Sequence, residues 1–151
     1  MTSWDAVVAA VGLALSGERA HGRIELMDWW QQTTAGDHAV RCVLAHYLAD
    51  CQDDLDNEVA WDKRALAAYA HLAPDDIAAI GIPDAAGMAP SLHLNLNLNL
   101  GDGYLRQGRR DDARAQFDAG LAACTALGDD GYATMIRKGL DGLRDRVAHA
   151  G

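Results

Sequence analysis

The amino-acid sequence predicts an all-α protein of about seven helices, arranged as antiparallel hairpins. Half of the 151 residues are hydrophobic, Pro occurs only three times, and Ala and Leu dominate, which is the usage of a helical protein with a packed core. Apolar residues also recur at three- and four-residue spacings along most of the chain, the period of one face of an α-helix. The length is that of one ordinary domain, so we expect a single domain over residues 1–151.

The first half of the chain carries four such patterns. Trp4, Val7 and Val11 share a helical face, and Gly17 ends that helix. Thr-Ala-Gly-Asp after the second pattern predicts a turn, and Asp37 is placed to cap the third helix. The patterns predict two hairpins, over about 3–34 and 37–72, with the third helix ending near residue 51 and the fourth starting near residue 55.

The second half begins with an irregular stretch over about 73–89. Its breaks come from glycine and proline, namely Pro74, Gly81, Pro83, Gly87 and the Pro90 that follows. Three further helices are expected, over about 91–107, 111–127 and 130–148. The first two form a third hairpin over 91–127, and the last is a single helix that caps this hairpin.

Residues 91–100 read SLHLNLNLNL, and this alternation admits either a strand or a helix. In a strand all five leucines would share one face. In a helix they divide into two nearly opposite stripes, as suits a helix packed between two neighbours. No other segment offers a partner strand, and burying a leucine is worth about 1.5–3 kcal/mol, against at most about 0.7 kcal/mol for placing an asparagine in a helix. We therefore predict a helix.

This helix and the next carry apolar and small residues in the spacing L-G-x-x-Y and then A-x-x-x-F. The matching residues are Leu100, Gly101, Tyr104, Gly108, Ala113, Phe117 and Gly120. They resemble a tetratricopeptide repeat (TPR) over about 94–127. The resemblance implies that Gly101 and Ala113 let two antiparallel helices approach closely. It also implies that Tyr104 and Phe117 fill the wedge between hairpins and that Gly108 opens the turn.

The match has two departures, because Asn97 stands where the family has Trp and Thr125 where it has Pro. The segments 37–72 and 3–34 resemble weaker, degenerate repeats. The architecture implied is a short TPR-like α-solenoid with a capping helix over about 130–148. The alternative is an unrelated α-helical bundle.

The formal net charge of −9, from 13 basic and 22 acidic residues, limits the classes of partner that the protein can bind. Such a surface repels phosphate backbones and anionic lipid heads, which disfavours nucleic acid and membrane. Cys42, Cys51 and Cys124 are an odd number without C-x-x-C spacing, so we expect reduced, buried thiols instead of a disulfide framework. The apolar run after Asp5 lacks a basic flank and is too short to span a bilayer, and we expect a cytoplasmic protein.

In the TPR family, a short peptide or protein segment lies in a concave groove lined by the first helix of each hairpin. The positions carried over are Cys42, His46, Ala49 and Asp50 on the third helix, and Asn95, Leu98, Asn99, Asp102, Leu105 and Arg106 on the helix from residue 91. The Lys and Asn with which some members hold a C-terminal carboxylate are absent here, since Leu98 and Asp102 stand in their place. Asp50 and Asp102 favour a basic or hydrogen-bonding ligand, and Arg106 is available to one carboxylate. The alternative is a solvated polar face without a ligand.

The third helix also carries metal-binding residue types every four residues: His38, Cys42, His46 and Asp50. Neighbouring members could share a zinc or copper ion with His93 or Asp102. One helix supplies only two ligands at a time, so we favour ordinary packing and predict no metal and no cofactor. A hydrolase that uses Cys42 or Cys51 with His46 is a further alternative. Because nothing marks an oxyanion hole for it, we predict no catalysis.

The function expected from the sequence is a non-catalytic module that binds a protein or peptide segment in the groove. The alternative is a homo-oligomeric scaffold, a homodimer at its simplest, held by terminal helices and exposed aromatic residues. We expect one of Trp29 and Trp30 to be buried and the other partly exposed. Together with Trp61 they either fill the core between hairpins or anchor an interface.

Overall fold

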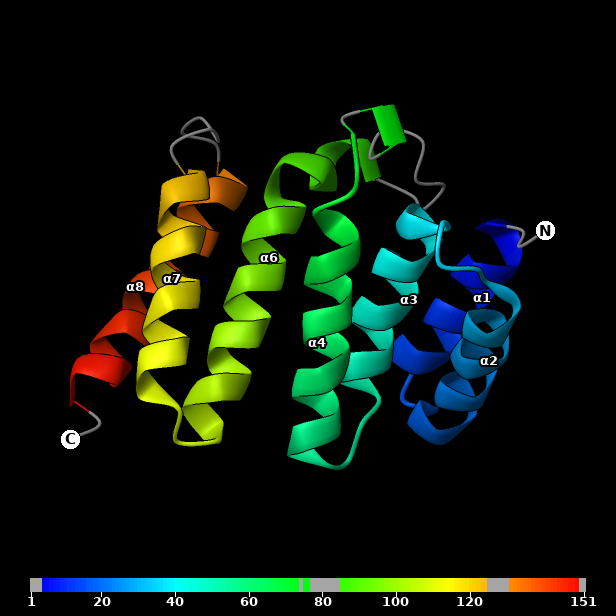
Figure 1. Cartoon of the computed structure of the whole chain (residues 1–151), viewed down its shortest axis with the longest axis horizontal. Coiled ribbons are helices and arrows are strands. Elements are labelled where there is room, and N and C mark those ends of the chain that lie inside the picture. Colours follow the sequence, from blue (N-terminus) through cyan, green and yellow to red (C-terminus); the bar gives the residue numbers. More distant parts are fainter. Residues whose placement is uncertain (1–3, 74, 77–84, 125–130, 150–151) are drawn as a thin grey trace. The chain divides into compact units, whose positions relative to one another are not determined.

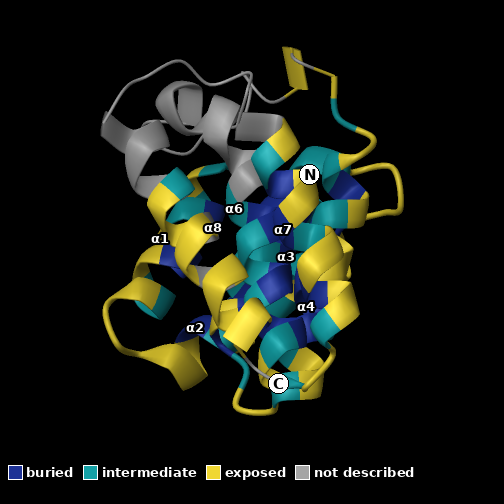
Figure 2. Cartoon of the chain, turned by 90° about the vertical axis from the view of Figure 1, so that its left-hand side faces the viewer, coloured by how far each residue is buried: buried dark blue, intermediate teal, exposed yellow. Residues whose placement is uncertain are grey.

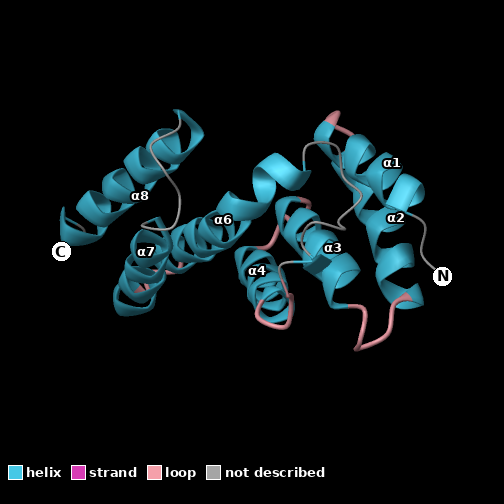
Figure 3. Ribbon diagram, turned by 90° about the horizontal axis from the view of Figure 1, so that it is seen from above, coloured by secondary structure: helices cyan, strands magenta, loops and turns pink. Residues whose placement is uncertain are grey.

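The structure is a computed structural model of the chain, and it describes residues 4–73, 75–76, 85–124 and 131–149. Helices joined by loops make up these residues, with no strand among them (Figure 3). The helices in the described ranges are α1 (Trp4–Leu15), α2 (Arg19–Gln32), α3 (His38–Asp50), α4 (Leu55–Tyr69), α6 (Ala85–Arg106), α7 (Arg110–Cys124) and α8 (Gly131–His149) (Figure 1). The predicted all-α class with seven helices is confirmed for this part of the chain. Of the helices described, none is long and apolar enough to cross a membrane.

The chain divides into two compact units, Met1–Ala86 and Gly87–Gly151, and each is described by itself. In unit 1, α1 packs against α2, α2 against α3, and α3 against α4. Unit 2 contains most of α6 together with α7 and α8, and α7 packs against α8. Antiparallel hairpins are therefore present, while the continuous solenoid and the single domain stay predictions.

Two glycines shape the first hairpin of unit 1. Gly17 has a φ of +96°, a left-handed conformation that only glycine adopts cheaply, and it follows the end of α1 as predicted. Gly22 on α2 lies so close to α1 that an added Cβ would be 2.7 Å from both Cα and N of Ala14. Val7 and Leu26, each 0% exposed, fill the core of this hairpin. The two helices can approach this closely only because residue 22 has no side chain.

Helix α3 supplies much of the core of unit 1, and its buried positions are dark blue in Figure 2. They are Cys42, Val43, Leu44, Ala45, Leu48 and Ala49. Helix α4 begins at a conventional cap, in which the Asp54 carboxylate accepts the backbone N–H of Asn57 at 2.9 Å. Asp37 does precede α3, but its carboxylate accepts the backbone N–H of Thr34 at 2.7 Å and makes no bond to a helix amide. The expected capping residue is thus in place with a different partner, and its bonds to Thr34 lower the pKa of Asp37.

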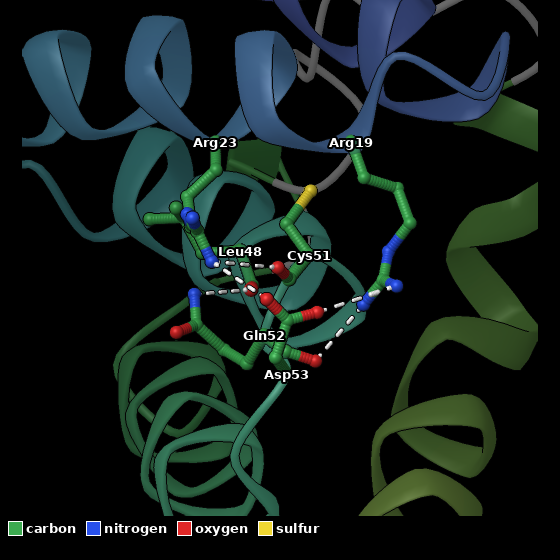
Figure 4. A network of polar contacts seen from close by, with 6 residues as sticks. All are labelled: Arg19, Arg23, Leu48, Cys51, Gln52 and Asp53. Atoms are coloured by element: carbon green, nitrogen blue, oxygen red, sulfur yellow. Dashed lines mark hydrogen bonds and ion pairs between the residues drawn. The ribbon is translucent and has the colours of Figure 1, made fainter.

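Two arginines of α2 fasten this helix to the segment after α3 (Figure 4). Arg19 Nη2 donates to the carbonyl oxygen of Gln52 at 2.9 Å, and Arg23 Nη1 donates to that of Cys51 at 3.5 Å. The Asp53 carboxylate lies 3.5 Å from Arg19 and 3.6 Å from Arg23. The guanidinium charges also complement the negative end of the α3 dipole, so this network joins the two hairpins of unit 1.

The alternating run over residues 91–100 lies within α6, which confirms the helix prediction. Leu96, Leu100 and Tyr104 are buried along one stripe. Leu98 and Leu105 of the second stripe are half-buried.

Helix α6 starts earlier than predicted, at Ala85 instead of near residue 91, so the expectation of irregular structure up to residue 89 is wrong. Gly87 and Pro90 lie inside the helix. Pro90 is the sixth residue of this long helix, where it removes one backbone hydrogen bond, and the strong helix formers Ala85, Ala86, Met88 and Ala89 precede it. Of the rest of the proline- and glycine-rich stretch, residue 74 and residues 77–84 lie outside the described residues.

Helices α6 and α7 make close contact at Gly101. A Cβ at this position would lie 2.2 Å from Cε1 of Phe117, whose side chain is 0% exposed. Gly108, in the turn between the helices, has a φ of +78°, and Ala113 is 0% exposed. The expected close approach at Gly101 and the glycine turn at Gly108 are confirmed. That Tyr104 and Phe117 fill a wedge between hairpins stays a prediction.

Candidate functional site

The groove positions predicted on α6 lie on its last three turns, and we call them the α6 face. They are Asn95, Leu98, Asn99, Asp102, Leu105 and Arg106. All are half-exposed except Arg106, which is exposed. Helix α8 passes near the middle of this face, because a Cβ added at Gly139 would lie 3.9 Å from Cδ2 of Leu98. Part of the second leucine stripe therefore packs on the chain's own last helix.

Asp102 on the α6 face is already paired with two arginines. Its carboxylate lies 2.9 Å from Nε of Arg106 and 3.6 Å from Nη1 of Arg146 on α8. Two guanidinium groups compensate the single negative charge, so the expected preference of this face for a basic ligand loses its electrostatic basis.

The other predicted groove residues, His46 and Asp50, belong to α3 in unit 1. Burial lowers the pKa of His46, and the Asp50 carboxylate partly opposes this shift. Burial likewise raises the pKa of Asp50, which the His46 charge opposes. The His46 ring also meets the Tyr47 ring edge-on, with centroids 4.8 Å apart. A groove shared by these residues and the α6 face stays a prediction.

The metal-type stripe on α3 does not converge on one point. His38 stacks on His71 of the segment after α4, with ring centroids 4.4 Å apart. Cys42 is 0% exposed, and burial raises the pKa of its thiol to about 12. Within the described ranges, no group of three or more His, Cys, Asp and Glu residues could hold a metal ion. The side chain of His93 lies outside the described residues.

Sequence reasoning missed a cluster of stacked arginines and tryptophans in unit 1, which we call the Arg–Trp cluster. It consists of Trp30 on α2, Arg41 on α3, and Trp61 and Arg64 on α4. The two indole rings meet edge to face, with centroids 4.9 Å apart. The guanidinium carbon of Arg41 lies 4.6 Å from the centre of the Trp30 ring, and that of Arg64 lies 4.3 Å from the Trp61 ring. Both distances suit a cation–π contact.

The tryptophans were only partly foreseen. Trp29 and Trp30 are both half-exposed, so the expectation that one of them is buried is wrong. Trp61 is the buried one, at 8% exposure. The spacing of Trp61 and Arg64, three residues apart on one helix, was the available sequence signal for an arginine stacked on an indole.

A surface hollow of about 300 Å³ adjoins the Arg–Trp cluster. Its lining residues come from α2, α3, α4 and the adjoining loops: Trp30, Ala35, His38, Arg41, Arg64, Ala67, Ala68 and His71. Two arginines and two histidines line it, and no carboxylate does. A larger hollow of about 580 Å³ between α7 and α8 is lined by charges of both signs, including an Arg144–Asp118 pair at 3.8 Å. Of these two hollows, only the one beside the Arg–Trp cluster favours a ligand of one charge.

Comparison with known proteins gave no match to the chain among protein-family models, curated proteins or solved structures.

Proposed function

We propose that the protein is a non-catalytic, TPR-like module of the cytoplasm that binds a peptide segment along the α6 face. The observation that carries this proposal is the hairpin of α6 and α7, in which the TPR-type residues Gly101 and Phe117 interlock. This packing leaves Leu105 half-exposed on the α6 face, which also carries the side chains of Asn95 and Asn99. Such a surface combines apolar area with polar side chains, as protein-binding surfaces do.

The state of the described thiols supports a role without nucleophilic chemistry. At a pKa of about 12 the buried Cys42 is a neutral thiol at physiological pH, whereas the thiolate is the nucleophile. Burial and the Asp50 carboxylate also raise the pKa of Cys51, and the nearby Arg19 and Arg23 only partly offset this.

A peptide-display selection tests the proposal. Immobilised protein should enrich a sequence motif from a random-peptide library, and the enriched peptide should bind about tenfold or more weakly to a Leu105→Glu variant. Ala115→Glu is the matched control, because Ala115 is exposed on α7 in the same unit. A library that yields no motif, or a peptide that both variants bind as well as the parent protein does, would rule out this role for the α6 face.

A homo-oligomeric scaffold is the second candidate, favoured by two exposed apolar side chains in unit 1. Leu15 on α1 is 68% exposed and Ile24 on α2 is 59% exposed. If they form a contact between copies, sedimentation at micromolar concentration should give a species larger than the monomer, and Ile24→Glu should dissociate it. A monomer at all concentrations eliminates the scaffold.

A further inference from the structure

We infer that the hollow beside the Arg–Trp cluster is a binding site for the carboxylate side chains of an acidic peptide. The site lies in unit 1, whereas the proposed function concerns the α6 face of unit 2. The inference and the proposed function can therefore be tested independently. The inference starts from the way in which Arg41 and Arg64 are held.

Arg41 is fixed in position before any ligand arrives. Its Nε donates to Oγ1 of Thr33 at 2.8 Å, and its Nη2 donates to the Thr33 carbonyl oxygen at 3.5 Å. The Trp30 ring supports one face of the same guanidinium. An arginine that is ordered in advance loses less side-chain entropy when it binds an anion.

The positive charges of the cluster are not matched by carboxylates. Among the described residues, no carboxylate oxygen lies within ion-pair distance of Arg41 or Arg64. Most other described arginines do have such a partner: Arg19, Arg23, Arg106, Arg109, Arg144 and Arg146. Asp37 is the acidic residue whose charge interacts with Arg41, but its carboxylate is bound to Thr34. Two arginines without carboxylate partners are unusual in a chain of net charge −9. An anion from a ligand would supply the missing partner.

The remaining lining suits a peptide side chain. Ala35, Ala67 and Ala68 give the hollow small apolar walls, and the rings of His38 and His71 add nitrogen atoms that can bond to a carboxylate. The volume of about 300 Å³ is at the lower limit for a small-molecule pocket, and an exposed arginine forms part of its rim. A short acidic segment fits this site better than nucleic acid, because a long phosphate backbone would also meet many of the acidic residues of a chain whose net charge is −9.

Fluorescence anisotropy with a labelled hexaglutamate peptide tests the inference on the full chain. The peptide should bind at low salt, and uncharged hexaglutamine should not. Arg64→Gln should weaken binding by about tenfold, the loss expected when one charged hydrogen-bonding partner is removed. Lys63→Gln is the control, because Lys63 is the exposed neighbour of Arg64 on α4 and does not line the hollow, and it should change binding less than about twofold.

The outcomes separate the possible ligands. Equal weakening by Arg64→Gln and Lys63→Gln would mean a general charge effect and would overturn the inference. Failure of hexaglutamate to bind, with inorganic phosphate protecting the protein against thermal unfolding, would replace the acidic peptide by phosphate and overturn it too. Arg41→Gln should also weaken binding by about tenfold. If that variant does not fold, the comparison of Arg64 with Lys63 still decides the question.

Discussion

Replacing Gly101 by alanine tests the α6–α7 contact most directly. The new Cβ would lie 2.2 Å from Cε1, 2.6 Å from Cδ1 and 2.9 Å from Cζ of Phe117, whereas carbon atoms pack at about 3.5–4.0 Å. The ring is 0% exposed and has no room to swing into solvent. Overpacking of this kind costs about 1–3 kcal/mol. At a contact as short as 2.2 Å we expect the upper part of this range, about 2–3 kcal/mol. The better helix propensity of alanine returns about 0.5–1 kcal/mol, so we expect a net loss of about 1–2.5 kcal/mol.

Urea unfolding followed by far-ultraviolet circular dichroism measures this loss. For a slope of about 2 kcal/mol per M, the urea midpoint should fall by about 0.5–1.3 M. Gly142→Ala on α8 is the matched control, because nothing lies within 4 Å of its added Cβ, and it should raise stability by about 0.5–1 kcal/mol. Adding Phe117→Leu to Gly101→Ala should cost less than the sum of the two single changes. A Gly101→Ala variant as stable as the parent protein would refute the packing argument.

Three further predictions concern unit 1, which contains all four tryptophans of the chain and can be followed by their fluorescence. Gly22→Ala, whose Cβ would meet backbone atoms of α1, should destabilise unit 1 by about 1–3 kcal/mol, whereas Gly12→Ala, with nothing within 4 Å, should stabilise it slightly. The thiol of Cys42 should react with a thiol reagent only as fast as the protein unfolds, and fast labelling of the native state would contradict its burial. Burial lowers the pKa of His46 below 6.5, so the unfolded chain takes up this proton first. The contribution of His46 to stability is therefore full above pH 6.5 and should fall as the pH drops from 6.5 towards its folded-state pKa, and a His46→Gln variant should lose this part of the pH dependence.

Local patterns predicted the helices well, because the physical causes lie within a few residues. Gly17 ends α1 and Gly108 forms the turn between α6 and α7, each through its own positive φ. The sequence predicts both positions. Burial of the leucines of 91–100 outweighs the low helix propensity of the asparagines between them, and α6 confirms the helix that this balance predicts. The start of α6 differs from the prediction because proline usually marks a helix boundary, whereas Pro90 lies inside the first turns of this helix.

The candidate sites were less predictable, because they depend on which helices meet. The pair of Asp102 with Arg106 follows from four-residue spacing, but nothing in the sequence places Arg146 of α8 beside the same carboxylate. The negative charge of Asp102, which looks unpaired in the sequence, is therefore compensated by two arginines in the structure. Conversely, Arg41 of α3 looks like an ordinary surface charge until the packing of α2 places Trp30 against it.

Net charge and local charge therefore lead to different conclusions about partners. The value of −9 describes the whole chain, while a ligand in contact with the surface responds mainly to charges within about one screening length, roughly 8 Å at physiological salt. Aspartates beyond that distance repel an acidic peptide only weakly, whereas the guanidinium groups of the Arg–Trp cluster would touch it directly. Screening weakens the distant repulsion more than it weakens the contact, so an acidic protein can still bind an acidic segment at a surface where its arginines lack carboxylate partners.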